Sequence, residues 1–204
     1  MTVKPLLLRD ITYLAKGTRG IASTAKLARR TVLIKERNPA SAVDTIAHEA
    51  QMLAIVNKVG IGPKLIRAEP GRLIREFVKG EEIMDWTKHT RPAAIRTMLA
   101  ELLDQCRELD RIGVNKTEMT RPYKHVLVYR HHPTQIDFDR SRRSPKPQNV
   151  TQLCQFMTSG RYAYLLRDCG VHLNASSLID AARNYKKAYA QREYERIRSL
   201  VKSE

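Results

Sequence analysis

The stretch GVNKTEMTRPYKHVLV, residues 113–128, is followed at residue 136 by IDFDRS, residues 136–141. Two short apolar segments here, residues 126–129 and 135–138, flank the turn-like sequence RHHPT and predict a β-hairpin. A hairpin returns the chain beside itself, so Asp137 is expected to lie next to His125, and both side chains are potential metal ligands. The pattern predicts a polar site at the base of the hairpin, although an acidic residue at a strand end also serves as a simple turn or cap.

The chain has 204 residues, of which 42% are hydrophobic, enough for one domain or a compact pair of small lobes. Its cysteines, Cys106, Cys154 and Cys169, include no C-x-x-C pair, so neither a disulfide framework nor a zinc site is indicated. The N-terminus lacks the pattern of a secretory signal, and no apolar run approaches the ~18 residues of a membrane span. We therefore expect a soluble, cytoplasmic protein with no membrane partner and assume a monomer.

The charge balance is strongly basic. The chain carries 37 Lys and Arg against 21 Asp and Glu, which gives a formal net charge of +16 and an isoelectric point near 10.1. Such an excess repels itself unless a polyanion shares it. A nucleic-acid partner is therefore favoured over the alternative of a merely well-solvated surface.

Sequence periodicity predicts an α+β fold in two parts. Short segments rich in branched and aromatic residues predict strands at 10–17, 20–28, 31–36 and 72–78. One helix is expected at 43–59, beginning with a capping-box-like sequence at 41–44 and ended by IGPKLI. Further helices are expected at 92–110, at 149–157, and from 177 nearly to the C-terminus. The expected architecture is a strand-rich lobe with one helix, residues 1–78, and a mostly helical lobe with one hairpin, residues 79–204.

Several residues of the first part are candidates for binding. Gly17 and Gly20 separate two strands, where a backbone without side chains can bend over phosphates or simply form a hairpin. Lys35 ends an apolar strand, either as a phosphate ligand or as a solvated strand end. Glu49 borders the apolar stripe of the next helix, where it is either exposed or turned inwards to pair with an ammonium group. The backbone of residues 76–78, at the lobe boundary, can hydrogen-bond a planar base.

In this order the segments resemble a minimal two-lobe protein-kinase-like fold. The resemblance implies that ATP and Mg²⁺ are cofactors and that Lys35 and Glu49 form an ion pair. It further implies that Asp137 holds Mg²⁺, with His125 in the position of a second metal ligand. The remaining nucleotide-binding residues implied are the hairpin residues Gly17, Thr18, Arg19 and Gly20, and the hinge residues Glu76 and Val78.

Two residues are candidates for the catalytic base. In the family's usual register the catalytic position falls on Thr120, which is not a general base near neutral pH. Glu118, two residues earlier, is the nearest carboxylate and serves if the loop is longer here. Lys124 and Arg121 are expected to stabilise charge on the transferred phosphate.

A narrower resemblance concerns the sequences TEMTRPYKHVLV, IDFDRS and KPQNVTQLCQF. They are similar to a small archaeal kinase group related to the atypical kinases of the Bud32 and RIO type. That resemblance implies an RNA kinase that phosphorylates the ribose 2′-hydroxyl of a variable-loop uridine in tRNA.

The distribution of charge bears on the substrate independently. Only nine residues, RSRRSPKPQ at 140–148, separate Asp139 from the next expected helix, and they carry four positive charges and no negative one. Such a segment suits phosphates better than a general peptide. The RNA-binding residues expected are Arg121, Arg140, Arg142, Arg143, Lys146, Lys186 and Lys187. A small atypical Ser/Thr protein kinase and a catalytically inactive RNA-binding pseudokinase remain as alternatives.

Overall fold

The chain divides into two compact units between Val78 and Lys79 in this computed structural model, which describes residues 5–203. The first unit is an antiparallel sheet with one α-helix, and the second is mostly helical, so the expected α+β class is confirmed. Within residues 5–203, no helix combines the length and the apolar character needed to cross a bilayer.

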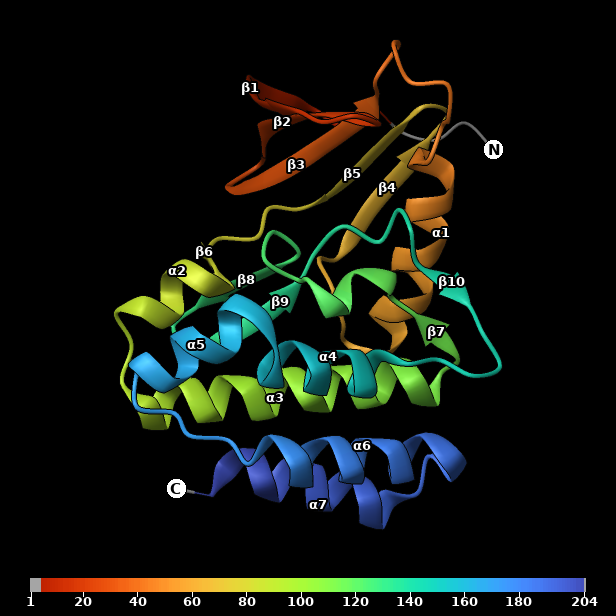
Figure 1. Cartoon of the computed structure of the whole chain (residues 1–204). Coiled ribbons are helices and arrows are strands. Elements are labelled where there is room, and N and C mark those ends of the chain that lie inside the picture. The colour runs from red at the N-terminus through yellow and green to blue at the C-terminus, as the bar shows by residue number, and fades with distance from the viewer. Residues whose placement is uncertain (1–4, 204) are drawn as a thin grey trace. The chain divides into compact units, whose positions relative to one another are not determined.

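Unit 1 is built on a five-stranded antiparallel sheet with the strand order β1-β2-β3-β5-β4 (Figure 1). Its strands are β1 (Leu8–Lys16), β2 (Gly20–Leu27), β3 (Arg30–Arg37), β4 (Leu65–Glu69) and β5 (Arg72–Glu76). The helix α1 (Ile46–Val56) packs against β3, β4 and β5 and continues into the 3-10 turn η1 (Asn57–Val59). The central strand β3 is buried in its middle, at residues 32–34, whereas the edge strand β1 is exposed along most of its length.

The two faces of this sheet have different surroundings. Val32 and Ile34 of β3 belong to an apolar cluster on one face. On the other face, Leu73 of β5 packs against Ile46 of α1. Lys35 is paired with Leu73 across β3 and β5, and paired residues point to the same face. The pleat of the sheet therefore directs Lys35 towards α1.

Helix α1 begins later than the sequence pattern predicts. The expected start near Val43 is wrong, because the Ser41 hydroxyl is used in a local turn with the backbone of Val43. Asp44 instead accepts a hydrogen bond of 2.9 Å from the N–H of Ile46, the first helical residue. Strand β4 was not expected, and Asn57 holds the connection to it through hydrogen bonds to Ile61, Pro63 and Leu65.

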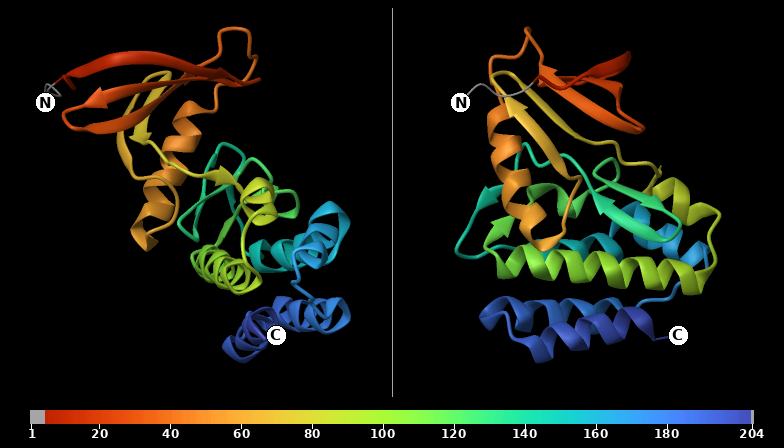
Figure 2. Two further views of the ribbon diagram at one scale, coloured as in Figure 1. Left: turned by 90° about the vertical axis from the view of Figure 1, so that its left-hand side faces the viewer. Right: turned by 180° about the vertical axis from the view of Figure 1, so that it is seen from behind.

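Unit 2 combines helices with two small antiparallel sheets. Its helices are α2 (Ile83–Lys88), α3 (Pro92–Arg111), α4 (Asn149–Thr158), α5 (Gly160–Asp168), α6 (Ala175–Ala188) and α7 (Gln191–Lys202), with the 3-10 turn η2 (Thr117–Thr120). One sheet has the order β6 (Glu81–Glu82), β8 (Val126–Tyr129), β9 (His132–Gln135), and the other pairs β7 (Val114–Asn115) with β10 (Arg142–Arg143). Figure 2 shows α6 and α7 running alongside each other below α3.

Helix α3 is the central helix in the core of unit 2. The sequence predicts an apolar face on it, and every residue of that face is fully buried: Ile95, Met98, Leu99, Leu102, Leu103 and Leu109. These side chains join α4, α6 and α7 in one core cluster. The helices α2 and α5 were not expected from the sequence.

The C-terminal helix is broken, contrary to the prediction of one helix beginning at Ser177. Asn174 caps α6 by accepting a hydrogen bond of 3.0 Å from the N–H of Ser177, so the helix begins earlier. It ends at Tyr189, which has a left-handed backbone with φ 53°. The Tyr189 hydroxyl donates to the Pro147 carbonyl at 2.7 Å, and its own carbonyl accepts from Arg107 at 2.9 Å. These contacts hold Tyr189 in the conformation that separates α6 from α7.

The hairpin exists, but its turn is shorter than expected. Arg130 and His131 alone form the turn, both with positive φ, which is the geometry of a two-residue hairpin loop. The second strand is β9 rather than residues 135–138, and Gln135 lies opposite Val126. The N–H of Ile136 still donates to the His125 carbonyl at 2.8 Å. Ile136 therefore lies opposite His125, and Asp137 is the next residue along the chain, just outside the hairpin.

Candidate functional site

Two groups of candidate residues exist, one in each unit. In unit 1, the Nζ atom of Lys35 lies 2.5 Å from the Oε2 atom of Glu49. Glu49 is fully buried on α1, so the alternative of an exposed helical glutamate is wrong. The strand register described above directs Lys35 to this helix, and the ion pair fixes its ammonium group beside the sheet.

The glycine turn between β1 and β2 is closed by its own backbone and by Asn38. The N–H of Gly17 donates to the carbonyl of Gly20 at 2.8 Å. The buried Asn38 donates its side-chain amide to the carbonyls of Gly17 and Thr18, at 3.0 and 3.2 Å, and its N–H to the carbonyl of Arg19 at 3.0 Å. Three successive carbonyls of the turn thus accept hydrogen bonds from one residue, which orders the turn without help from any ligand.

Gly20 also has a packing role. A Cβ atom at this position would lie 3.1 Å from Cε of Lys35 and 3.3 Å from the carbonyl oxygen of Glu36. A side chain here would therefore push against the stem of Lys35. Asn38 was missed by the sequence analysis; the dipeptide Asn38-Pro39 is a turn signal but does not reveal a contact twenty residues back along the chain.

The backbone of residues 76–78, expected to hydrogen-bond a planar base, is already partly used in hydrogen bonds within unit 1. The N–H of Glu76 donates to the Lys64 carbonyl at 2.9 Å, and the Glu76 carbonyl accepts from Arg75 at 3.1 Å. Both backbone groups of Glu76 are thus engaged within unit 1. Val78, which is half-buried, lies at the end of this unit.

In unit 2 a cluster of charged groups surrounds His125. Burial lowers the pKa of His125, and the positive charge of Lys116 lowers it further, whereas the carboxylates of Asp137, Glu118 and Asp139 raise it. All four side chains are therefore close enough to act on the imidazole. The structure brings together His125, Asp137 and Glu118, as the sequence analysis expected for the first two.

Lys116 organises the backbone of this cluster. It is fully buried, and its Nζ atom donates to the carbonyl of Ile136 at 2.7 Å and to the carbonyl of Asp137. The same atom lies 4.4 Å from the centre of the Phe138 ring, within cation–π range. Asp137 has φ 62°, so the lysine holds a left-handed residue in place. The sequence gives no signal of this role, because a lysine in a basic loop usually faces solvent.

Glu118 is the most unusual side chain of the cluster. It lies in η2 and is only 10% exposed, with the Nζ atom of Lys116 at 4.0 Å. Both of its carboxylate oxygens are buried, and within residues 5–203 neither has a hydrogen-bond partner. Burying a carboxylate in this state is costly, so such a group usually has a function or a ligand. Thr120, the alternative base, is exposed.

The basic segment 140–148 lies against the start of this loop. Arg142 and Arg143 form β10 and pair with Asn115 and Val114, and Arg143 donates to the carbonyl of Ile112 at 2.9 Å. The cationic side chains expected to contact RNA are all exposed: Arg121, Arg140, Arg142, Arg143, Lys146, Lys186 and Lys187. Lys124, expected to stabilise the transferred phosphate, is exposed as well. Lys186 of α6 donates to Gln148 at 3.2 Å, which connects the segment to the C-terminal helices, and Lys187 donates to Asn184 at 3.0 Å.

The chain matches no protein-family model, and no curated protein is significantly similar to it.

Proposed function

We propose that the protein is an ATP- and Mg²⁺-dependent RNA kinase with a minimal kinase-like fold. Its substrate would be a tRNA, and the acceptor a ribose 2′-hydroxyl of a variable-loop uridine. The observation that carries the proposal is Glu118, a buried carboxylate without a hydrogen-bond partner among the described residues, in one cluster with Asp137. A strongly cationic segment borders the same loop, which favours a polyanionic acceptor.

Nucleotide binding is assigned to the ordered groups of unit 1. Lys35, fixed by Glu49, would contact the phosphates of ATP, and the glycine turn would offer them its backbone N–H groups other than that of Gly17, which is bonded to Gly20. Val78 would supply backbone groups to the adenine base. Glu76 contributes less than expected, because its backbone is already hydrogen-bonded within the sheet.

Metal binding is assigned to Asp137. A carboxylate oxygen is a ligand that Mg²⁺ prefers, whereas the imidazole of His125 is a poorer one. Among residues 5–203, no three His, Cys, Asp or Glu side chains form a group that would chelate a metal alone. The remaining ligands would be phosphate oxygens and water. When bound, Mg²⁺ neutralises phosphate charge and orients the phosphates for transfer.

The transfer step needs a base and a polyanion site. Glu118 would accept the proton of the ribose 2′-hydroxyl as the oxygen forms its bond to the γ-phosphorus. The bond between that phosphorus and the β–γ bridging oxygen breaks, and ADP leaves with the bond electrons. Lys124 and Arg121, both exposed next to this loop, would stabilise the negative charge on the transferred group.

One labelling experiment tests the proposal against its alternatives. The full-length protein is incubated with γ-labelled ATP and Mg²⁺, together with tRNA, casein or no acceptor. We expect label in tRNA as a 2′-phosphate, next to a 3′,5′-phosphodiester that resists alkali because the 2′-hydroxyl is blocked. Label in casein alone would favour a small Ser/Thr protein kinase. No transfer, with tRNA still bound, would favour a pseudokinase.

A further inference from the structure

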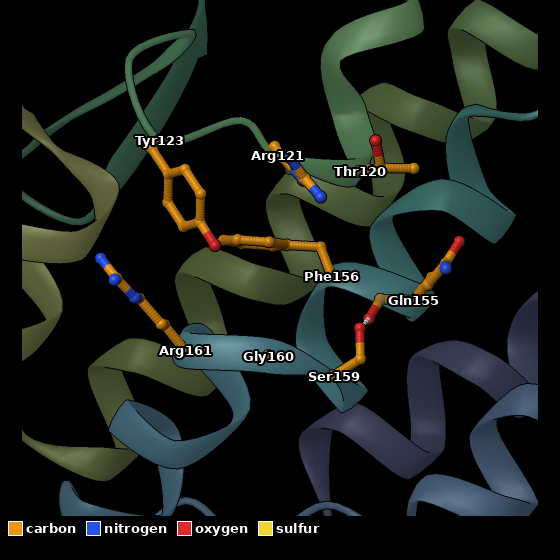
Figure 3. A pocket seen from close by; sticks show the side chains of 8 residues that line it. All are labelled: Thr120, Arg121, Tyr123, Gln155, Phe156, Ser159, Gly160 and Arg161. Atoms are coloured by element: carbon orange, nitrogen blue, oxygen red, sulfur yellow. Dashed lines mark hydrogen bonds between the residues drawn. The ribbon is translucent and has the colours of Figure 1, made fainter.

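A pocket of about 550 Å³ lies within unit 2, next to the loop that carries Glu118 (Figure 3). One wall is formed by Thr120, Arg121 and Tyr123, and the other by the α4–α5 corner with Gln155, Ser159 and Arg161. Its size suits a ligand of nucleotide dimensions. Thr120 belongs to the same 3-10 turn as Glu118, two residues further along.

The charge of the pocket is positive. Arg121 and Arg161 come from segments forty residues apart, and both are exposed. Within residues 5–203 neither guanidinium group has a carboxylate partner, and none of the residues lining the pocket is acidic. Arg161 also lies in the first turn of α5, where Ser159 uses its hydroxyl to donate to the Gln155 carbonyl and does not cap the helix. Two arginines and an uncapped helix start together favour a phosphate.

An aromatic side chain stands beside these charges. The Tyr123 ring packs edge-on against Phe156, with ring centres 5.5 Å apart, and Phe156 stacks on Tyr162 at 4.2 Å. Phe156 and Tyr162 are buried, so they fix the position of Tyr123 at the pocket wall. Thr120, Gln155 and Ser159 add neutral side chains that donate and accept hydrogen bonds. Unpaired RNA bases are recognised by this combination of an aromatic face and neutral polar groups.

A second hollow, of about 350 Å³, shares Gln155 with this pocket. Arg183 and Lys186 of α6 line it, and Arg183 also pairs with Asp180 at 3.3 Å, so cationic side chains of α6 border α4 beyond the pocket. A single phosphate would not use both hollows, whereas a polynucleotide strand has successive phosphates to place in them. This continuity favours RNA over a free anion or a short phosphopeptide.

We propose that the pocket binds one unpaired nucleotide of the RNA substrate, with the base against Tyr123 and its phosphate between Arg121 and Arg161. The adjoining hollow on α4 and α6 takes a neighbouring phosphate. This site rests on the proposed function for its substrate class. Thr120 on its wall belongs to the same 3-10 turn as Glu118, so an acceptor nucleotide next in the strand would lie near that turn. Arg161, Tyr123 and Gln155 had no role in the sequence analysis.

The test is equilibrium binding without ATP, measured by the fluorescence anisotropy of a labelled single-stranded oligoribonucleotide and of tRNA. Arg161→Gln removes one charge from the pocket, and Arg167→Gln is the matched control, because both residues are exposed arginines of α5. We expect Arg161→Gln to weaken RNA binding about tenfold and to lower the salt slope of the affinity by about 0.7. Arg167→Gln should bind RNA as the wild type does.

Variants of Tyr123 provide a second test of the proposed site. Tyr123→Ala should weaken binding of the single strand about tenfold, because it removes base stacking, whereas Tyr123→Phe should retain the affinity. Thermal unfolding of each variant separates loss of the site from loss of the fold. Wild-type RNA affinity in both Arg161→Gln and Tyr123→Ala would overturn the proposal, as would an equal loss in Arg167→Gln. Preferential binding of a phosphopeptide, lost in Arg161→Gln, would also overturn it. Because the binding assay contains no ATP, its result does not depend on whether the protein is a kinase.

Discussion

Lys116 donates a hydrogen bond from its buried Nζ atom to the carbonyl of Asp137, a residue with a left-handed backbone. The same ammonium group bonds the Ile136 carbonyl and lies over the Phe138 ring. One side chain thus fixes the three residues that lead out of the hairpin. The position of the Asp137 carboxylate, and with it the proposed metal site, depends on this lysine.

Replacing Lys116 by Met keeps a long apolar side chain but leaves the carbonyl oxygens of Ile136 and Asp137 without this donor. We expect the free energy of unfolding to fall by about 2–4 kcal/mol, the usual cost of breaking a buried charged network from one side. Urea unfolding of the variant and the wild type measures the difference. An unchanged midpoint would mean that the Lys116 contacts do not stabilise the fold.

Asp137 should be needed for transfer rather than for folding, whereas Lys35 should be needed for transfer and should also stabilise unit 1 through its ion pair with the buried Glu49. Neither belongs to an apolar cluster, and each would contact charge that develops on the phosphates. Lys35→Ala and Asp137→Ala should each reduce phosphate transfer to tRNA ~100-fold or more, while the circular dichroism spectrum is retained. Near-normal activity of a folded Asp137→Ala variant would contradict the kinase proposal.

Glu118 and Thr120 are alternatives for the base, and conservative variants separate them. Glu118→Gln keeps the size of the side chain and removes the carboxylate, so a general-base role predicts a rate loss of ~100-fold with little change in RNA affinity. Thr120→Val should have a mild effect on the rate. Single-turnover rates with saturating tRNA measure both. A fully active Glu118→Gln together with an inactive Thr120→Val would instead place the catalytic position at Thr120, as in the family's usual register.

The sequence predicted those elements whose signal is local. The apolar face of α3 repeats with helical spacing, and Lys35 directly follows three buried apolar residues of β3, a pattern that can be read from a few neighbours. The predicted hairpin turn is too long, because the sequence pattern assigns Pro133 to the loop. Pro133 lies instead in β9, at the edge of its sheet, where the missing N–H of proline is tolerated.

Features set by distant contacts were not predictable in this way. The break between α6 and α7 depends on the bonds from Tyr189 to Pro147 and from Arg107 to Tyr189. The role of Asn38 depends on a turn some twenty residues earlier, and Arg161 gains its role only when α5 is folded beside Arg121. Each of these residues is ordinary in its local sequence, so periodicity and motif spacing do not mark it.

Asp110 predicts a pH dependence of stability. It is buried and accepts hydrogen bonds from both the N–H and the side chain of Asn149, at 2.9 and 2.7 Å, and from the Tyr185 hydroxyl at 3.0 Å. Burial raises its pKa, although these hydrogen bonds lower it in part. Because the folded state then holds the proton more firmly than the unfolded state, the stability contributed by Asp110 is present in acid and is lost as pH rises through its folded pKa.

The variant Asp110→Asn does not titrate and serves as the reference. We expect it to be less stable than the wild type, because its amide group faces donors, and we expect the difference to be larger near pH 4 than near pH 7. Urea unfolding at both pH values measures this difference. A difference that grows with pH would show that the hydrogen bonds outweigh burial in setting the pKa.

The positive charge of the chain predicts how tRNA binding responds to salt. Arg140, Arg142, Arg143 and Lys146, together with lysines of α6, are exposed, and each phosphate that they neutralise releases counterions. With about five such contacts, the affinity should fall ~300- to 1,000-fold between roughly 50 and 250 mM monovalent salt. The affinity for ATP alone should change far less. Filter binding of folded tRNA across a salt series measures the slope.

Three double variants with equal charge changes locate these contacts. Arg142→Glu with Arg143→Glu should remove phosphate transfer to tRNA and leave ATP affinity intact, because these residues lie beside the loop that carries Glu118. Lys186→Glu with Lys187→Glu should weaken tRNA binding with less effect on the rate at saturation. Arg29→Glu with Arg30→Glu is the control and should bind tRNA normally; Arg29 is an exposed residue of the β2–β3 turn and Arg30 is the exposed first residue of β3. A flat salt series, or equal losses in all three double variants, would mean that net charge alone attracts RNA and that segment 140–148 does not form the binding surface.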